Sequence, residues 1–301
     1  MNYYNEIKEQ LLNNEVYKKV KDYSKNKNEL ETYYNVGKLI IEAQGGETRA
    51  KYGDSLIKEY SKKLIYEVGK KYNERTLRRI RQFYLFIENQ KWSAMPTKLT
   101  WSHYTELFVL NNASEINYYI DISIDQNLTY RELHEKIKNK EYERLPKDTK
   151  NKLKLKEEIK INDFIKNPIL IKNSYNYTKI TEKILKQLIL EDLPNFLSEL
   201  GEGFCFIKDE YKIKIGDRYN YIDLLLYNIK YNCYVVVELK VTELKKEYIG
   251  QIGTYMNYID KNIRSINQDK TIGIIICKKG NDFVMEYCSD DRIFETNFIL
   301  N

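Results

Sequence analysis

The chain has 301 residues and a formal net charge of +6, from 50 lysines and arginines against 44 aspartates and glutamates. This length suits two domains, each able to bury a core without disulfide bonds. The four cysteines form no C-x-x-C pair and the second half of the chain has no histidine, which argues against disulfides, zinc and a Ser-His-Asp triad there. No apolar run approaches the roughly 20 residues of a membrane span and no signal-peptide core is present, so we expect a soluble, cytoplasmic protein.

Residues 1–145 have the apolar spacing of helices and are predicted to form an all-α domain. In the segment 73–87, Asn73 is a plausible N-cap and an apolar stripe recurs at helical spacing. The stripe consists of Leu77, Ile80, Phe83, Tyr84 and Ile87.

The opposite face of this predicted helix carries Arg75, Arg78 and Arg79. Nine basic and three acidic residues lie between Lys58 and Arg81, so this segment alone accounts for the net charge of the chain. Two helices joined by a short turn, the second with a basic outer face, are typical of a helix-turn-helix that binds DNA. The alternative is a basic face that is simply solvated, or one that binds a protein partner.

The composition and the apolar spacing of the sequence change after residue 145. Residues 146–166 are highly charged with little apolar periodicity, and we expect a linker there. Residues 167–301 are predicted to form an α/β domain around a mixed sheet, which makes the chain α+β overall. The predicted helices cover residues 180–192 and 246–262, and the predicted strands cover 204–209, 211–216, 222–228, 233–241, 272–277 and 282–288.

The two strands around residues 222–241 contain charges within apolar runs. If they form an antiparallel hairpin across the four residues 229–232, cross-strand partners sum to 461 and Asp223 faces Glu238. Directly opposite side chains lie on one face, about 5 Å apart, and Lys240 projects from the same face. Two opposed carboxylates need a positive group between them, and Mg²⁺ or Mn²⁺ fits that requirement.

The alternative is a surface hairpin whose polar face happens to hold two acids and a lysine. The flanking runs "LLLY" and "YVVV" are apolar at every position, as in a strand that is covered on both sides. Unsatisfied charges at the end of such strands cost several kcal/mol. This burial favours the metal site.

An aspartate on one strand, E-x-K on the next and "GQIGTY" on the following helix resemble the PD-(D/E)XK (restriction-endonuclease-like) superfamily. The wider pattern, with "YYNVGKLI", "RTLRRIRQFY" and "LTWSHYTELF" in the first half, resembles the YhcG-type family of nucleases with its helical amino-terminal domain. The resemblance covers nearly the whole chain.

The resemblance implies roles for individual residues. Asp223 and Glu238 would hold the metal together with the backbone carbonyl of Leu239, and Lys240 would orient the attacking water or offset developing charge. Glu199 matches the additional acid of the superfamily, although a solvent-facing helix acid is an alternative reading.

Gln251 and Tyr255 match a Q-x-x-x-Y pattern found in some nucleases of this superfamily, and their spacing places them on one face of a helix. The resemblance implies a catalytic role for Gln251 and contact with nucleic acid for Tyr255. A packing role for Tyr255 is the alternative.

We therefore expect a metal-dependent nuclease that acts on DNA, as an endonuclease rather than an exonuclease, with Mg²⁺ or Mn²⁺ as cofactor. RNA is not excluded as the substrate, and a homo-oligomer is left open. The rival from another class is a non-catalytic binding protein that keeps the nuclease fold as a scaffold. The family context suggests genome maintenance or defence against phage.

Overall fold

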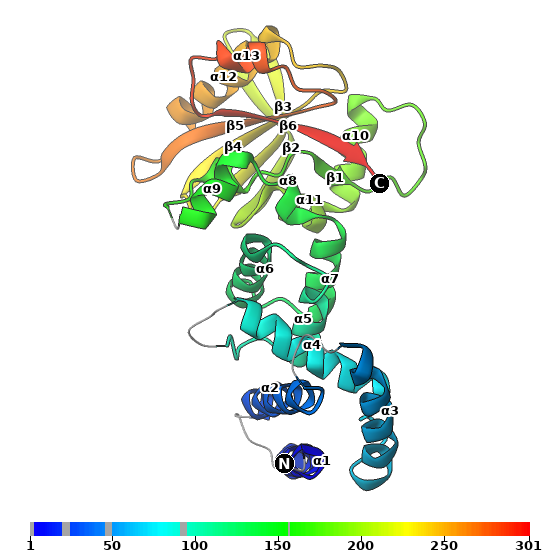
Figure 1. Cartoon of the computed structure of the whole chain (residues 1–301). Helices are drawn as coiled ribbons and strands as arrows, with labels where there is room; N and C mark the ends of the chain where they lie inside the picture. Colours follow the sequence, from blue (N-terminus) through cyan, green and yellow to red (C-terminus); the bar gives the residue numbers. More distant parts are fainter. Residues whose placement is uncertain (1–2, 20–24, 46–49, 91–94, 156) are drawn as a thin grey trace. The chain divides into compact units, whose positions relative to one another are not determined.

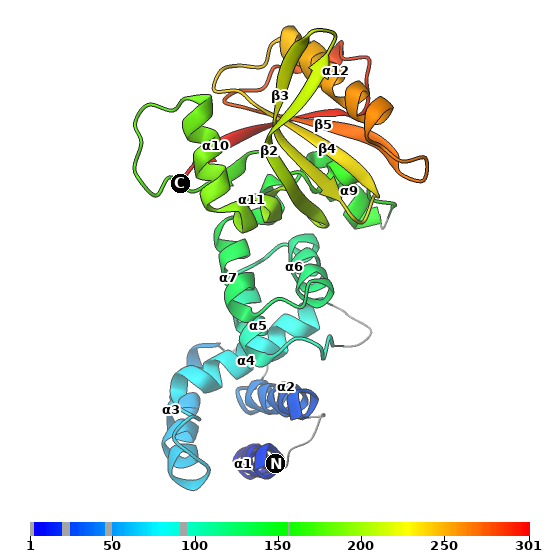
Figure 2. The same cartoon turned by 180° about the vertical axis from the view of Figure 1, so that it is seen from behind.

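In the computed structural model of the chain, residues 3–19, 25–45, 50–90, 95–155 and 157–301 are described. The chain divides into two compact units, Met1–Tyr142 and Glu143–Asn301. Figures 1 and 2 show the first as helical and the second as a sheet with helices around it. In the described ranges, no helix is long and apolar enough to cross a membrane.

The first unit is all-α in the residues that are described, as predicted. Its helices are α1 (Tyr3–Lys19), α2 (Lys25–Ala43), α3 (Ala50–Glu67), α4 (Glu74–Gln90), α5 (Trp101–Leu107), α6 (Ala113–Asp125) and α7 (Tyr130–Lys138). The short helix α8 (Glu141–Arg144) spans the boundary between the units.

Helices α2 and α4 cross closely, and Gly37 permits the approach. A Cβ atom at Gly37 would lie 2.6 Å from both the Ile80 carbonyl oxygen and the Tyr84 Cβ. On α4 the predicted stripe is buried at Leu77, Ile80 and Phe83, joined by Phe86 in place of Ile87. The α2–α4 contact is therefore a central part of the core of this unit.

The start of α4 is fixed as the sequence suggests. The Asn73 Oδ1 accepts a hydrogen bond from the Thr76 backbone N–H (3.0 Å), the geometry of an N-cap. Arg75, Arg78 and Arg79, the α4 arginines, are all exposed. The Arg78 guanidinium pairs with Glu74 at 2.8 Å within the same helix.

The second unit contains a six-stranded mixed sheet, counted over its described residues, in the order β1-β6-β5-β4-β3-β2. Strands β1, β6, β5 and β4 run parallel to one another, whereas β3 is antiparallel to both β4 and β2. The strands are β1 (Ile169–Ile171), β2 (Phe204–Ile215), β3 (Arg218–Asn228), β4 (Cys233–Leu239), β5 (Asp269–Cys277) and β6 (Ile293–Leu300). The helical elements are α9 (Lys147–Leu155), the 3₁₀ turn η2 (Ile161–Phe164), α10 (Glu182–Glu191), α11 (Leu193–Leu200), α12 (Lys246–Asn262) and α13 (Asp282–Glu286).

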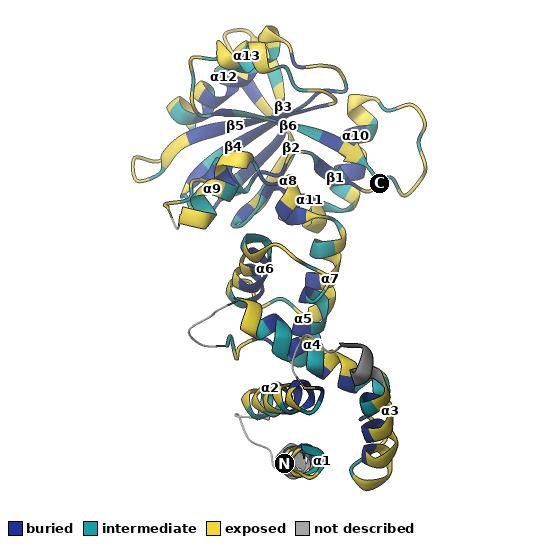
Figure 3. Ribbon diagram, viewed as in Figure 1, coloured by how far each residue is buried: buried dark blue, intermediate teal, exposed yellow. Residues whose placement is uncertain are grey.

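Both faces of the central strands are covered, as their apolar sequences predicted (Figure 3). One face of β4, with Val235 and Val237, joins a core that includes α10 and α11. The other face, with Val236, packs against α12. A charged side chain at the end of β4 therefore lies at the edge of a dry interior.

The β3–β4 hairpin has the predicted register. Leu224 pairs with Val237 and Asn228 with Cys233, so partners sum to 461, and residues 229–232 form the turn. The fully buried Asn228 fastens this turn: its Nδ2 donates to the Glu202 carbonyl (2.9 Å), and its Oδ1 accepts from the backbone N–H groups of Lys230 and Tyr231.

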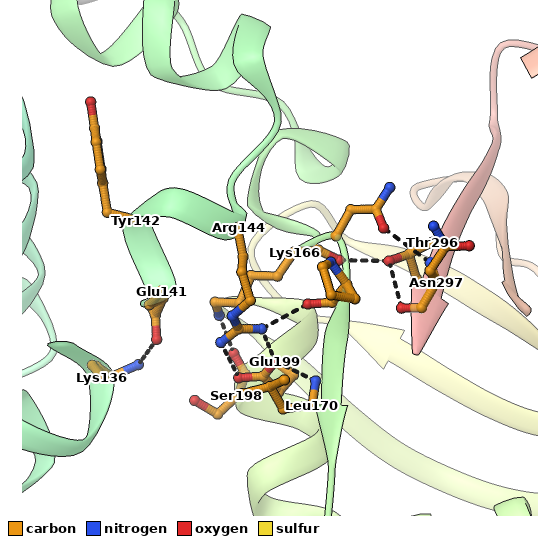
Figure 4. Close-up of polar contacts among 12 residues, drawn as sticks. Lys136, Glu141, Tyr142, Arg144, Lys166, Leu170, Ser198, Glu199, Thr296 and Asn297 are labelled. Atoms are coloured by element: carbon orange, nitrogen blue, oxygen red, sulfur yellow. Dashed lines mark hydrogen bonds and ion pairs between the residues drawn. The ribbon is translucent and has the colours of Figure 1, made fainter. Parts of the chain in front are cut away.

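The segment 146–166 differs from the expected linker, because it forms α9 and η2 and belongs to the second unit. Ile161 and Ile165 join the core of that unit. Figure 4 shows the end of this segment, where the Lys166 carbonyl accepts a hydrogen bond from Thr296 Oγ1 (2.6 Å). The many charged residues of segment 146–166 led to the linker prediction, although Ile161 and Ile165 are core positions.

The strand predictions also need correction in several places. Residues 204–215 form one strand, β2, with an irregularity between Phe206 and Lys208, instead of two. Residues 282–286 are helical, because the Asn281 side chain caps the helix α13. Strands β1 and β6 were missed. Strand β1 has only three residues, and the β6 sequence "IFETNFIL" mixes polar and apolar residues without strict alternation.

Candidate active site

The candidate site lies where the β3–β4 ladder ends, one residue beyond the Leu224–Val237 pair. Asp223 at this position accepts a hydrogen bond at its Oδ2 from the Leu239 backbone N–H (3.0 Å). The carboxylate thus takes the place of a strand carbonyl, and it faces Glu238 as the register predicts.

Glu238 is the most buried charged group of the site, with 2% of its surface exposed. Its Oε1 accepts hydrogen bonds from Lys240 Nζ (2.7 Å) and Gln251 Nε2 (2.8 Å). Its Oε2 is buried and, within the described part of the chain, has no hydrogen-bond partner. A buried oxygen of this kind is costly unless a further cation approaches it.

The electrostatics agree with this geometry. Burial, followed by the nearby Asp223 carboxylate, raises the pKa of Glu238 from 4.5 to about 7 despite the opposing effect of Lys240. Burial by itself lowers the pKa of Lys240, but the hydrogen bond and charge of Glu238 outweigh it, so the pKa of this ammonium group is raised. The lysine is therefore held in its charged form.

Helix α12 supports the site from one side. Gln251 donates to Glu238 and also, through the same Nε2, to the Tyr255 hydroxyl (3.1 Å). Tyr255 is only 6% exposed and packs in the core between α12 and the sheet. Its burial and its hydrogen bond with Gln251 favour the packing role over the predicted contact with nucleic acid.

Helix α10 supplies two residues that the sequence analysis missed. Glu182 Oε1 lies 3.9 Å from Lys240 Nζ, and Lys186 Nζ lies 3.8 Å from Asp223 Oδ1. The two are four residues apart and hence on one helix face, next to the buried Leu185 and Ile189 that pack on the sheet. The helix carries further polar residues at Lys183 and Gln187, so its sequence alone did not single out Glu182 and Lys186.

Lys186 also donates to Glu210 Oε1 (2.6 Å) on β2. Glu210 stands opposite Asp223 in the β2–β3 ladder, where regular pairing is interrupted between Asp209–Leu224 and Tyr211–Ile222. Its φ of 44° is in the left-handed region, which is unusual for a residue other than glycine. The backbone thus leaves regular strand geometry beside the site.

Glu199 is not brought to this site. Its carboxylate is buried in an ion pair with the Nη1 and Nη2 atoms of Arg144, and its Oε2 also accepts from the Leu170 backbone N–H (2.8 Å) (Figure 4). Arg144 Nη1 donates further to the Pro168 carbonyl (2.9 Å). Glu199 therefore holds α8, α11 and β1 together instead of completing a metal site.

The site residues suit a divalent cation. Among the described residues, the carboxylates of Asp223, Glu238, Glu182 and Glu210 outnumber the two ammonium groups of Lys240 and Lys186 by two. No cluster of three or more His, Cys, Asp or Glu side chains with metal-binding geometry occurs in the described ranges. Two carboxylates and a backbone carbonyl, with water and substrate as further ligands, are an ordinary arrangement for Mg²⁺.

Comparison with known proteins is consistent with this geometry. The model of the YhcG PDDEXK nuclease domain matches residues 162–297, and that of the DUF1016 N-terminal domain matches residues 7–144. The chain belongs to the YhcG-type family of PD-(D/E)XK nucleases. A relative named "Putative nuclease YhcG" from Escherichia coli (strain K12) is 26% identical over 283 residues, covering 82% of this chain and 76% of the relative.

Two solved structures resemble part of the chain. One, described as the crystal structure of a repair endonuclease from Pyrococcus abyssi, is 18% identical with a TM-score of 0.29 and covers 40% of this chain. The other, described as the structure of an EndoMS-dsDNA2 complex, is 19% identical with a TM-score of 0.31 and covers 42% of this chain. The match spans 48% of each of those chains. PD-(D/E)XK nucleases as a class generally use divalent metal ions.

Proposed function

We propose that this YhcG-type nuclease hydrolyses phosphodiester bonds in DNA, as an endonuclease that depends on Mg²⁺ or Mn²⁺. The observation that carries the proposal is the buried, unpartnered Glu238 Oε2, which stands beside Asp223 and Lys240 where two strands end. A scaffold without catalysis has no need of such an unsatisfied oxygen.

Asp223, Glu238 and the Leu239 carbonyl would hold the cation. When bound, the cation supplies stabilisation of negative charge on the attacked phosphate and lowers the pKa of a coordinated water. The protein fixes the ligands beforehand: the Leu239 N–H orients Asp223, and Gln251 orients Glu238. Preorganised ligands of this kind avoid a reorganisation cost during the reaction.

Lys240 is positioned to act on the substrate. The residue is 7% exposed, and its ammonium is held by Glu238 and lies 5.1 Å from the Tyr248 ring centroid. A fixed positive charge beside the ligands can offset charge that develops on the phosphate oxygens or orient the attacking water. We propose that Lys240 is a catalytic residue and not a metal ligand.

The α4 arginines are proposed to bind the phosphate backbone of the same substrate. All three side chains are exposed on one helix of the first unit, and arginine pairs well with phosphate oxygens. The choice of DNA over RNA follows the family resemblance, and the setting in genome maintenance or phage defence remains a prediction from the same source.

The test is incubation of the full-length protein with Mg²⁺ or Mn²⁺ and a panel of linear, circular, branched and single-stranded DNA, together with RNA. Cleavage of DNA, including closed circles, is expected for the wild type and for the control Asp269→Asn, which alters an exposed aspartate on β5. Asp223→Asn and Lys240→Ala should be inactive. Cleavage of RNA alone would overturn the substrate, and no cleavage by the folded wild type would favour the scaffold.

A further inference from the structure

The β2–β3 hairpin extends past the rest of the sheet as a two-stranded ribbon (Figure 2). Strand β3 pairs with β4 only from Leu224 onward, whereas its pairing with β2 continues to Ile215–Arg218. Gly216 and Asp217 form the two-residue turn, and the φ of 59° at Gly216 suits the first position of such a turn. We call residues 211–222 the ribbon.

The two faces of the ribbon differ sharply. Ile213 and Ile222 are buried and join the core beneath α12. Because strand side chains alternate, the opposite face carries Lys212 and Lys214 of β2, together with Tyr219 and Tyr221 of β3. The two tyrosines are 57% and 52% exposed, so packing within the unit does not account for them.

Lysine and tyrosine are interleaved on this exposed face. Lys212 is the cross-strand partner of Tyr221, and Lys214 is the partner of Tyr219. The Lys212 Nζ lies 3.8 Å from the Tyr219 ring centroid, and the Lys214 Nζ lies 6.0 Å from it. A flexible lysine can leave the ring for a phosphate when a base occupies the aromatic face.

Protection of the sheet edge explains only part of this pattern. Lysines on an edge strand such as β2 discourage pairing with other chains. Exposed tyrosines have the opposite tendency, because aromatic side chains favour strand association. The pairing of aromatic faces with positive charge instead matches single-stranded nucleic acid, which exposes bases for stacking and phosphates for ion pairing. A blunt duplex hides its base faces.

The ribbon leads directly to the candidate active site. Tyr221 precedes Asp223 by two residues on the same strand, which places their Cα atoms about 7 Å apart, and Tyr219 lies about 7 Å further along. We propose that the ribbon binds an unpaired, single-stranded segment of the substrate beside the cleaved phosphodiester, with bases stacked on Tyr219 and Tyr221 and phosphates paired with Lys212 and Lys214. This inference rests on the proposed function and specifies its substrate class: tailed, flapped or branched DNA in preference to blunt duplex.

The experiment measures binding of the full-length protein without metal, so that cleavage is not required. Fluorescence anisotropy would compare a single-stranded oligonucleotide, a blunt duplex and a duplex with a single-stranded tail. The variants are Tyr219→Ala and Tyr221→Ala, the corresponding phenylalanine variants, and the control Tyr287→Ala, which removes a tyrosine that is 83% exposed near α13. A 2-aminopurine base in the tail reports stacking by its fluorescence.

Each alanine variant should weaken binding of the single strand and the tailed duplex roughly tenfold or more, with the blunt duplex changed less than twofold. The phenylalanine variants keep the aromatic face and should bind as the wild type does, and Tyr287→Ala should have no effect. The 2-aminopurine fluorescence should fall on binding to the wild type and the phenylalanine variants only. Lys212→Ala and Lys214→Ala should each lower the salt slope by about 0.7 for the single strand.

Equal weakening for blunt and tailed duplexes, unchanged binding in both alanine variants, or loss in the phenylalanine variants would each overturn the inference. The two proposals fail separately. Tyrosine-dependent binding in a protein that never cleaves would overturn the proposed function alone, whereas cleavage of blunt duplex with tyrosine-independent binding would overturn the ribbon alone.

Discussion

Replacing Glu238 with glutamine should change how the stability of the metal-free protein depends on pH. In the folded protein the pKa of Glu238 is raised to about 7 from 4.5, chiefly by burial and then by Asp223. Between these two values the folded protein binds a proton at this site and the unfolded chain does not. The wild type therefore loses stability as the pH rises through this window, and glutamine, which does not titrate, removes that loss.

The size of the effect follows from the shift. A difference of one pKa unit corresponds to 1.36 kcal/mol, so raising the pKa from 4.5 to about 7 makes the contribution about 3 kcal/mol between pH 4 and pH 8. For a unit of about 150 residues, each kcal/mol shifts the melting temperature by about 2–4 °C. Relative to Glu238→Gln, the wild type should therefore lose roughly 10 °C across this range.

The assay is a series of melting curves from pH 5 to pH 8 in the presence of a chelator. The matched control is Glu247→Gln, which neutralises an exposed glutamate on α12 and should follow the wild type. At pH 8, Mn²⁺ at 100 times its dissociation constant should stabilise the wild type by about 2.7 kcal/mol and leave Glu238→Gln nearly unchanged. Parallel pH profiles for the wild type and Glu238→Gln would refute the raised pKa assigned to the buried Glu238 carboxylate.

Three further outcomes are expected. Asp223→Asn should abolish the metal-induced rise in melting temperature, whereas Lys240→Ala should retain it and lose cleavage; equal behaviour of the two variants would contradict the division into ligand and catalytic residue. Replacing the three α4 arginines with alanine should reduce the slope of log affinity against log salt on duplex DNA by about 0.9 per lost phosphate contact, and an unchanged slope would assign that face to solvent or protein. Arg144→Ala should destabilise the second unit by about 3–5 kcal/mol in chemical denaturation, because it leaves Glu199 buried without its partner, and a loss below 1 kcal/mol would contradict that reading.

The sequence predicted structure best where the apolar pattern of two strands and the short turn between them together fix the strand pairing. The register of the β3–β4 hairpin could be predicted because two apolar runs are separated by only four residues, which limits the possible pairings. The same register placed Asp223 opposite Glu238. Helical periodicity placed Gln251 and Tyr255 on one face of α12, where they form a hydrogen bond. These are local relations along one or two elements.

Relations between distant elements could not be obtained in this way. Nothing in the local pattern shows that Arg144 neutralises Glu199, 55 residues away, or that α10 brings Glu182 to Lys240. Segment 146–166 was wrongly predicted to be a linker for a related reason. Its buried residues Ile161 and Ile165 are two apolar positions among many charged ones. Its burial depends on what packs over it and not on its own composition.

The turn that joins β3 to β4 fixes the register that places Asp223 opposite Glu238, although it is distant from both residues. Asn228, which fastens this turn through Glu202, Lys230 and Tyr231, lies five residues from Asp223, about 17 Å along an extended strand. A strand that slips by one residue turns each of its side chains to the opposite face, so an insertion in the turn would direct Asp223 away from Glu238 without touching either residue. We therefore expect loop length at 229–232 to affect activity, because the alignment of the two proposed ligand carboxylates depends on a turn that is held by an amide contacting neither of them.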